Sequence, residues 1–143
     1  ALATFAHQPQ GGLAIGVVVA QAQVNLVDQR DATVCTHHLG NAAHFVGVET
    51  APLVFLLAWL RCLLRPNCQI RYRNLWQQPL DGFDVVDCFL SPAPMPRLWA
   101  KARAEMSPGA LLISNTFAIP DVAPDQLIEL HDWRSSRLLI WRL

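Results

Sequence analysis

Charged residues are scarce in this sequence of 143 residues, and lysine is nearly absent. Acidic and basic residues number 11 each, and Lys101 is the one lysine. This balance excludes a global electrostatic field that would attract nucleic acid or acidic membranes, so we expect no nucleic-acid partner. Hydrophobic residues make up 52% of the chain, which excludes intrinsic disorder, because disorder needs low hydrophobicity and high net charge. The length suits a single domain, residues 1–143, with a buried core.

Paired cysteines at metal-binding spacing are also lacking. The four cysteines stand apart from one another: Cys35, Cys62, Cys68 and Cys88. We interpret them as free thiols of a chain in the reducing cytoplasm, with a disulfide framework or a zinc site as the less favoured alternative. His37 and His38 are adjacent and point in different directions, and no nearby cysteine or carboxylate set completes a site. We therefore predict no metal ion.

No apolar run is long enough to span a bilayer. The run Leu13–Ala20 has no basic residue before it, and Ala51–Leu60 is bounded by Arg61, so we predict neither a membrane span nor a signal peptide. The chain begins at Ala1 and not at Met, so we expect a fragment, truncated at the N-terminus, or a processed product. A Ser-His-Asp arrangement and a phosphate-loop motif are missing as well.

The second half of the chain, in contrast, has a clear pattern. Residues 83–90 predict a buried strand that ends in the turn Ser91-Pro92, and residues 94–106 predict an amphipathic helix with one apolar stripe. Residues 110–117 predict a second buried strand. Strand, helix and strand in this order indicate a parallel α/β sheet, whose ligands bind beyond the carboxyl ends of the strands. Ser91 and Asn115 are therefore expected near a site.

The middle of the chain predicts a similar unit. Residues 44–49 form a short strand that ends in Glu49. Thr50 can cap the following helix, Pro52 suits its first turn, and the helix is expected to end near Leu64. Because this helix is apolar on nearly every side, we expect it to be deeply packed or covered by a neighbour.

The remaining strands are predicted at the margins of the sheet. Residues 69–73 alternate and indicate a strand near a sheet edge, closed by Asn74-Leu75-Trp76. Residues 126–130 and 137–143 lie close in sequence with no helix between them, so we expect an antiparallel hairpin. The apolar stretch 13–27 favours a strand that ends at Val27-Asp28, although a helix in its middle remains an alternative.

These motifs resemble class I S-adenosylmethionine-dependent methyltransferases. The resemblance rests on Val48-Glu49, Asn74-Leu75-Trp76, the run from Phe83 through Leu90-Ser91-Pro92 to Trp99, the run Met106–Asn115 and the terminal hairpin. It covers residues 44–143, whereas residues 1–43 match poorly. The resemblance is nearest to small bacterial members, which are themselves similar to lysine methyltransferases of ATP synthase c subunits and of the adenine nucleotide carrier.

The resemblance implies a cofactor, S-adenosylmethionine, and a role for individual residues. Glu49 is expected to accept hydrogen bonds from the ribose hydroxyls, Asn74 to contact the adenine amine, and Ser91-Pro92 to line the methyl-transfer site. The carboxylate role is sound chemically, because one carboxylate can bind a diol by two hydrogen bonds. The full set of cofactor-binding residues that we predict is Asp28, Glu49, Thr50, Asn74, Leu75, Ser91 and Pro92.

The chain departs from the family in two places. The family has a glycine-rich turn after its first strand, but Gln29–Thr33, which follow Asp28, contain no glycine. We interpret the segment as degenerate or as a local frameshift with the register restored near Ala43. The turn after the fourth strand in many amino-directed members reads Asp/Asn-Pro-Pro-aromatic, and Leu90-Ser91-Pro92 differs, so the motif does not identify an amine acceptor.

The sequence therefore predicts a Rossmann-like three-layer α/β sandwich with a mostly parallel sheet that ends in an antiparallel hairpin. The predicted function is transfer of a methyl group to an unidentified acceptor, and a protein lysine is one candidate. An inactive remnant or binding domain is the alternative, favoured by the missing glycine turn, and a nucleotide-binding oxidoreductase is a weaker one. Structural roles also remain open, since Glu49 can be a solvated residue before a helix, Asn74 a turn residue and Ser91 a helix start. No catalytic residue can be named.

Overall fold

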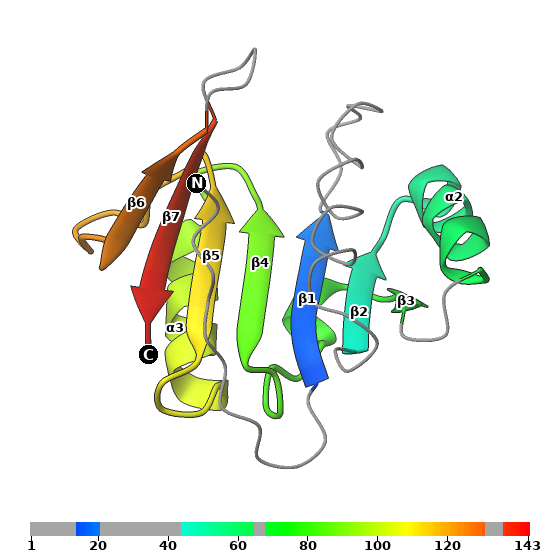
Figure 1. Ribbon diagram of the computed structural model, residues 1–143, viewed down its shortest axis with the longest axis horizontal. Helices are drawn as coiled ribbons and strands as arrows, with labels where there is room; N and C mark the ends of the chain where they lie inside the picture. The colour runs from blue at the N-terminus through cyan, green and yellow to red at the C-terminus, as the bar shows by residue number, and fades with distance from the viewer. Residues whose placement is uncertain (1–13, 21–43, 65–67, 131–135) are drawn as a thin grey trace.

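The computed structural model describes residues 14–20, 44–64, 68–130 and 136–143, and these residues build one seven-stranded sheet (Figure 1). The strand order is β3-β2-β1-β4-β5-β7-β6. The strands are β1 (Ala14–Ala20), β2 (His44–Glu49), β3 (Cys68–Tyr72), β4 (Val85–Phe89), β5 (Leu111–Asn115), β6 (Gln126–Glu129) and β7 (Arg137–Arg142). The first five strands of the chain pair in parallel, and β7 pairs antiparallel with both β5 and β6. The predicted Rossmann-like sheet with a terminal hairpin is confirmed.

The strand order reverses between β1 and β4. From β1 the chain proceeds outward through β2 to β3, whereas β4 lies on the other side of β1 and the chain proceeds from there to β5. In an open parallel sheet, such a reversal leaves a crevice at the carboxyl ends of the two central strands, because the connections on either side depart in opposite directions. The strand order therefore leads us to expect a ligand beside Ala20, the last residue of β1, and Phe89, the last residue of β4.

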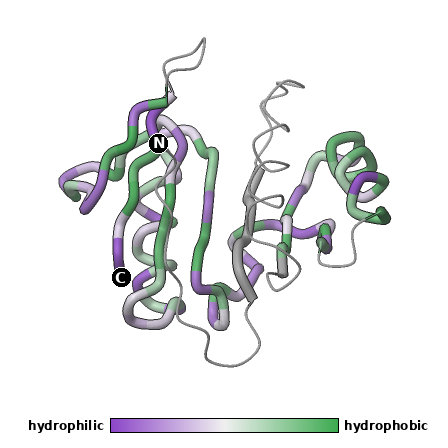
Figure 2. Tube along the Cα trace, viewed as in Figure 1, coloured by the Kyte–Doolittle hydropathy of each residue, from purple (hydrophilic) through white to green (hydrophobic). Residues whose placement is uncertain are grey.

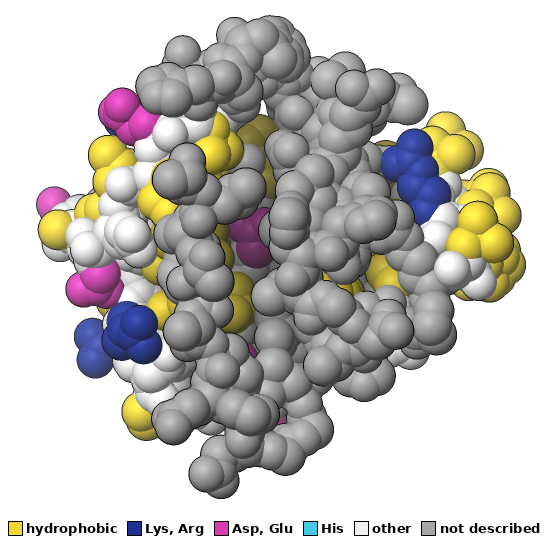
Figure 3. Space-filling model, viewed as in Figure 1, with side chains coloured by type: hydrophobic (Ala, Val, Ile, Leu, Met, Phe, Trp, Pro, Cys, Tyr) yellow, Lys and Arg dark blue, Asp and Glu magenta, His cyan; other side chains and the backbone are white. Residues whose placement is uncertain are grey.

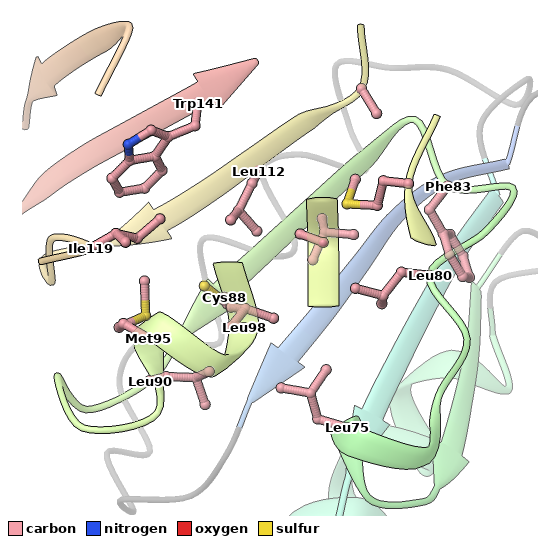
Figure 4. Close-up of a cluster of buried hydrophobic side chains, with 14 of the residues drawn as sticks. Leu75, Leu80, Phe83, Cys88, Leu90, Met95, Leu98, Leu112, Ile119 and Trp141 are labelled. Atoms are coloured by element: carbon pink, nitrogen blue, oxygen red, sulfur yellow. The ribbon is translucent and has the colours of Figure 1, made fainter. Parts of the chain in front are cut away.

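The core lies between the sheet and helix α3 (Met95–Glu105), which lies behind β5 and β7 in Figure 1. Met95, Leu98 and Ala102 occupy one stripe of α3 and are fully buried. They pack against inward side chains of the strands, among them Val86, Cys88, Leu112 and Trp141 (Figure 4). Pro94 and Pro96 start this helix, where missing backbone donors cost nothing. Because this stripe packs against one face of the sheet, the side chains on the other face of β4 point away from α3.

Helix α2 (Pro52–Cys62) contradicts one expectation, because none of its residues is buried. Figure 2 shows the α2 segment as hydrophobic, and Figure 3 shows apolar surface on that side of the molecule. The exposed apolar residues of α2 and of the turn after it are Leu53, Leu56, Leu57, Trp59, Leu60, Leu63 and Leu64. The prediction of a deeply packed helix is wrong for the described part of the chain. The physical reason is position: α2 lies at the edge of the sheet, and its Phe55 ring packs edge-on against Tyr72 of the edge strand β3, 5.2 Å between centroids.

The predicted boundaries of β1 and α2 have different outcomes. Strand β1 is described as Ala14–Ala20, and its predicted end at Val27-Asp28 lies outside the described residues, as do His37 and His38. The residue that precedes α2 is Ala51 and not Thr50, and no side-chain cap is present there. Pro52 does occupy the first turn, as predicted. In the described ranges, no helix is both long and apolar enough to cross a membrane.

Candidate functional site

Glu49 is the last residue of β2, and its carboxylate is almost completely buried, with 2% of the residue exposed. One oxygen, Oε1, accepts the backbone N–H of Thr50 at 2.7 Å and that of Ala51 at 2.8 Å. These N–H groups lie at the start of α2, where backbone donors lack partners within the helix. The carboxylate therefore does the work that Thr50 was predicted to do, and it is held in one orientation by the backbone.

The second oxygen of Glu49 is the most informative atom at this rim. Oε2 is buried and has no hydrogen-bond partner in the described part of the chain. A buried acceptor without a donor costs on the order of 1–3 kcal/mol, and more when it is charged. A ligand that donates a hydrogen bond to Oε2 would therefore stabilise this arrangement. A ribose diol offers such hydroxyl donors. The residues present thus fit the ribose of S-adenosylmethionine.

Asn74 and Leu75 follow β3 at the same edge of the sheet. Leu75–Gln77 form a short 3₁₀ helix, η2, and the Asn74 side-chain oxygen caps it by accepting the backbone N–H of Trp76 at 3.0 Å. Asn74 is exposed and its oxygen has a second lone pair, so the cap does not exhaust its capacity to accept a hydrogen bond. Leu75 is buried in the core, with 3% exposed, so only its backbone can serve a ligand.

Ser91 and Pro92 are exposed and follow the buried Leu90 at the end of β4. The Pro92 carbonyl accepts the backbone N–H of Met95 at 3.2 Å, which bends the chain from β4 into α3. One turn into that helix, the Arg97 guanidinium lies 4.2 Å from the ring centroid of Trp76. This cation–π contact joins the loop after β4 to the loop after β3.

The loop after β5 contains a feature that the sequence did not reveal. Thr116 has a φ of 78°, a left-handed conformation that β-branched residues rarely adopt. Asn115 Oδ1 accepts the Thr116 hydroxyl at 2.8 Å, and the Phe117 carbonyl accepts the hydroxyl of the buried Ser114 at 2.7 Å. No glycine marks this turn, so the usual sequence signal for positive φ was missing.

The aromatic ring of Phe117 approaches that of Phe89, with 6.1 Å between ring centroids and 39° between ring planes. Phe89 is the last residue of β4 and is 37% exposed, although its strand is otherwise largely buried. Sequence reasoning treated Phe89 as one more apolar strand residue. Its position in the alternation, opposite to the buried Cys88, was the signal that could have identified it.

The strand register shows which predicted residues the fold brings together. Gly47, Val18 and Asp87 are paired across β2, β1 and β4, so Glu49 and Phe89, each two residues further on, lie on the same face of the sheet. Asn74 and Ser91 follow the carboxyl ends of β3 and β4 at the same edge. Asp28 cannot be placed, because it lies outside the described residues.

Acidic and thiol groups near the site form neither a metal centre nor a nucleophile. Burial and the neighbouring Asp87 carboxylate raise the pKa of the Cys88 thiol to about 12, and the Ser114 hydroxyl opposes this only in part. The thiol is therefore protonated and unreactive at neutral pH. Asp81 and Asp84 are exposed in the turn before β4, whereas Asp87 is half-buried within it. In the described ranges, no group of three or more His, Cys, Asp or Glu side chains could hold a metal ion.

Comparison by sequence assigns the larger part of the chain to one domain family. Residues 30–126 match the ANTKMT methyltransferase domain. The match begins earlier than the resemblance seen in the sequence, which started at residue 44, and ends where the terminal hairpin begins. No protein of curated function matches the sequence.

Comparison by structure finds the same architecture in solved proteins. An RNA methyltransferase from Salinibacter ruber in complex with S-adenosyl-L-homocysteine superposes with a TM-score of 0.74, at 20% identity over 90% of this chain and 80% of that chain. Aeropyrum pernix fibrillarin with natively bound S-adenosyl-L-methionine has a TM-score of 0.64, at 13% identity over 90% and 66% of the two chains. The ribosomal protein L11 methylase from Lactobacillus delbrueckii subsp. bulgaricus has a TM-score of 0.64, at 13% identity over 91% and 70%. At these identities the likeness is one of fold.

Proposed function

We propose that this chain, which belongs to the ANTKMT methyltransferase domain family, holds S-adenosylmethionine at the carboxyl rim of its sheet and directs its methyl group to an acceptor bound beside β4. Family and fold together identify a class I methyltransferase with S-adenosylmethionine as its cofactor. The observation that carries the residue assignments is the buried, unpartnered Oε2 of Glu49.

Each rim residue has a role that its contacts support. Glu49 Oε1 is fixed by two backbone N–H groups, so Oε2 is pre-oriented toward a ribose hydroxyl and loses little entropy on binding. Asn74, held by its cap on Trp76, presents a neutral acceptor for the adenine amine, and the adjacent Leu75 backbone extends that contact. Thr50 takes part through its backbone only, and Ser91-Pro92 shape the loop nearest the reacting group. Asp28 remains a prediction.

The chain's own contribution to the reaction is alignment. When bound, the cofactor supplies a sulfonium methyl group that a nucleophile displaces directly. Such a transfer depends on holding the two reactants in line and close together, and a general base is optional. Cys88 is excluded as a nucleophile by its raised pKa of about 12 and its complete burial. We infer that the rim acts by positioning and assign no catalytic acid or base.

The acceptor to be tested first is the amine of a protein lysine, because the sequence resembles lysine methyltransferases. The loop Leu90-Ser91-Pro92 lacks the motif typical of amino-directed members, so this choice rests on the resemblance alone. The described cysteines Cys68 and Cys88 are free thiols, as suits a chain that works in the reducing cytoplasm.

Calorimetric titration with S-adenosylhomocysteine tests the proposal. We expect saturable binding of one equivalent with a dissociation constant in the micromolar range, about 10 μM, which corresponds to about 7 kcal/mol. A parallel thermal melt with the same ligand should show a higher midpoint, because the ligand binds only the native state. If neither experiment detects binding at millimolar ligand, the chain is a methyltransferase fold without cofactor, and the proposal is wrong.

A further inference from the structure

We propose that Phe89 and Phe117 form the wall of the methyl-acceptor site, with Thr116 as the residue that positions Phe117. The wall fits an apolar group of the acceptor, an aromatic ring or an alkyl chain, next to its nucleophilic atom. This inference rests on the proposed function, because it places the acceptor relative to the bound cofactor.

The first argument is position. Phe89 is paired with Ala20, so the ring stands at the point where the strand order reverses, which is where a ligand crevice forms in a parallel sheet. Glu49 ends β2 on the same face, two strands away. Adjacent strands lie about 4.8 Å apart, so the ribose-binding carboxylate and Phe89 are separated by roughly 10 Å along the rim. A cofactor anchored at Glu49 and extending toward β4 brings its reacting end beside Phe89.

The second argument is the exposure of an aromatic ring where burial would be expected. The neighbours of Phe89 in the chain, Cys88 and Leu90, are 1% and 2% exposed, whereas Phe89 is 37% exposed. The ring does not stand alone, since Phe117 lies 6.1 Å from it, and Phe117 also packs against the main core. Phe117 is therefore rigidly supported and Phe89 presents open apolar surface. Aromatic walls with one free face are typical of small-molecule sites.

The third argument is the strain at Thr116. A φ of 78° strains a β-branched residue, and such strain persists only where neighbouring contacts enforce it. Those contacts are present: the Thr116 N–H donates to the Arg137 carbonyl at 2.7 Å, and its hydroxyl donates to Asn115. The Phe117 N–H in turn donates to the Asn115 carbonyl at 3.0 Å. The turn thereby reverses the chain within one residue of β5 and directs Phe117 toward β4.

Aromatic rings select for apolar surface and exclude water from it. Two tilted rings bind another ring by edge or offset contacts in addition to the area buried, and they bind an alkyl chain by burial alone. Removal of water beside the reacting atoms also favours a close approach of the nucleophile. The wall thus predicts an acceptor whose nucleophile is attached to an apolar group.

A fluorinated probe tests the wall without knowledge of the natural acceptor. We suggest 4-fluorobenzyl alcohol, followed by fluorine NMR in the presence of the full chain saturated with S-adenosylhomocysteine. We expect saturable broadening of the probe signal, and at least a fivefold weaker affinity for Phe89→Ala. Trp59→Ala is the matched control, because Trp59 is 42% exposed on α2, away from β4, and its removal should leave probe affinity within twofold.

Thr116 has its own variants, which separate positioning from folding. Thr116→Val keeps the shape but loses the hydroxyl bond to Asn115, and we expect at least a twofold loss of probe affinity. Thr116→Asn tolerates the left-handed conformation and should restore binding to the wild-type value. S-adenosylhomocysteine affinity should fall less than probe affinity in Phe89→Ala and in Thr116→Val, because the anchor of the cofactor at Glu49 is retained.

The possible results are distinguishable. If wild-type chain binds S-adenosylhomocysteine but Phe89→Ala binds the probe as well as wild type does, the wall is refuted and the proposed function stands. The same holds if the wild-type chain does not bind the probe at concentrations up to about 10 mM, roughly tenfold above the dissociation constant of about 1 mM expected of a weak site. If S-adenosylhomocysteine does not bind the wild-type chain, both the proposed function and the proposed acceptor wall are refuted.

Discussion

The carboxylate of Glu49 accepts the backbone N–H of Ala51 across 2.8 Å, so the last residue of β2 holds the start of α2. This relationship links structure to function at one atom pair. The oxygen that anchors the helix is fully used, because it also accepts the Thr50 N–H, while the other oxygen is buried without a partner in the described residues. The local fold thus orients a carboxylate whose second oxygen can accept a hydrogen bond from a ligand.

Asn74 allows the cap and the ligand contact to be separated. Asn74→Ala removes the side-chain bond to the Trp76 N–H and should lower the free energy of unfolding by about 1 kcal/mol, as for other lost caps. It should also weaken S-adenosylhomocysteine binding, because the acceptor is lost. Asn74→Asp keeps the cap, and we expect stability within about 0.5 kcal/mol of wild type and binding at least as tight. Urea unfolding and calorimetry give the two quantities. A variant Asn74→Ala with unchanged affinity would show that Asn74 only turns the chain.

The strained turn after β5 predicts a stabilising substitution. Thr116→Asn should raise the free energy of unfolding by up to about 1 kcal/mol, because Asn adopts positive φ more readily than a β-branched residue. Thr116→Val, which loses the hydroxyl bond to Asn115 and keeps the strain, should lower it by about 1 kcal/mol. Chemical denaturation of both variants provides the measurement. Equal stabilities of the two variants would mean that Thr116 is not strained.

The fold was largely predictable from sequence, because apolar runs of strand length alternate with helical spacing. β2, β4, β5 and the hairpin of β6 and β7 all follow from such runs. The packing of α2 was not predictable, since periodicity reports how apolar a helix is and not whether a neighbour covers it. The predicted end of the first strand at Val27-Asp28 lies outside the described residues and stays a prediction.

Acid should destabilise the loop before β4 through Glu105. Partial burial alone would raise the pKa of this carboxyl, but hydrogen bonds from Lys101 and the Leu80 N–H, together with the Lys101 charge, lower it below 4.5. A carboxyl whose folded pKa is lower than its unfolded pKa adds stability above the unfolded value, and this stability is lost as the pH falls through the folded value. We therefore expect the free energy of unfolding to decrease below pH 4.5.

The matched variant for this effect is Glu105→Gln, which retains an oxygen for the Leu80 N–H but no charge for Lys101. Denaturation curves between pH 3 and pH 6, roughly the titration range of a carboxyl, should fall less steeply with acid in the variant than in wild type. Parallel curves would exclude Glu105 as a source of the pH dependence.

Thiol reactivity should distinguish Cys88 from the other described cysteines. With a pKa of about 12, its thiolate fraction at pH 8 is about 1 in 10,000, and the side chain is fully buried. Iodoacetamide at pH 8, followed by peptide mass mapping, should label Cys62 and Cys68 and leave Cys88 unmodified until the chain is denatured. Labelling of Cys88 at the rate of Cys62 in the folded protein would contradict the burial of β4.

The site was predictable only where its chemistry coincides with a strand end. Glu49 and Asn74 were predicted from the resemblance to methyltransferases, in which the residues that end the second and third strands contact the cofactor at one edge of the sheet, and their roles stay predictions. Phe89 and Thr116 were not, because an aromatic strand residue has the same pattern whether it is exposed or buried, and positive φ at a non-glycine residue leaves no mark in the sequence. Such features arise from tertiary contacts, here the bonds of Thr116 to Asn115 and Arg137.

Titration of Glu49→Gln with S-adenosylhomocysteine tests the central claim most directly. The amide keeps the shape and one oxygen for the Thr50 and Ala51 N–H groups but removes the negative charge and the second acceptor. The control is Glu129→Gln, an exposed acid on β6 at the other end of the sheet. For Glu49→Gln we predict a dissociation constant at least tenfold larger, a loss of about 1.4 kcal/mol of binding free energy. For Glu129→Gln we predict no change. Wild-type affinity in a folded Glu49→Gln variant would contradict the account.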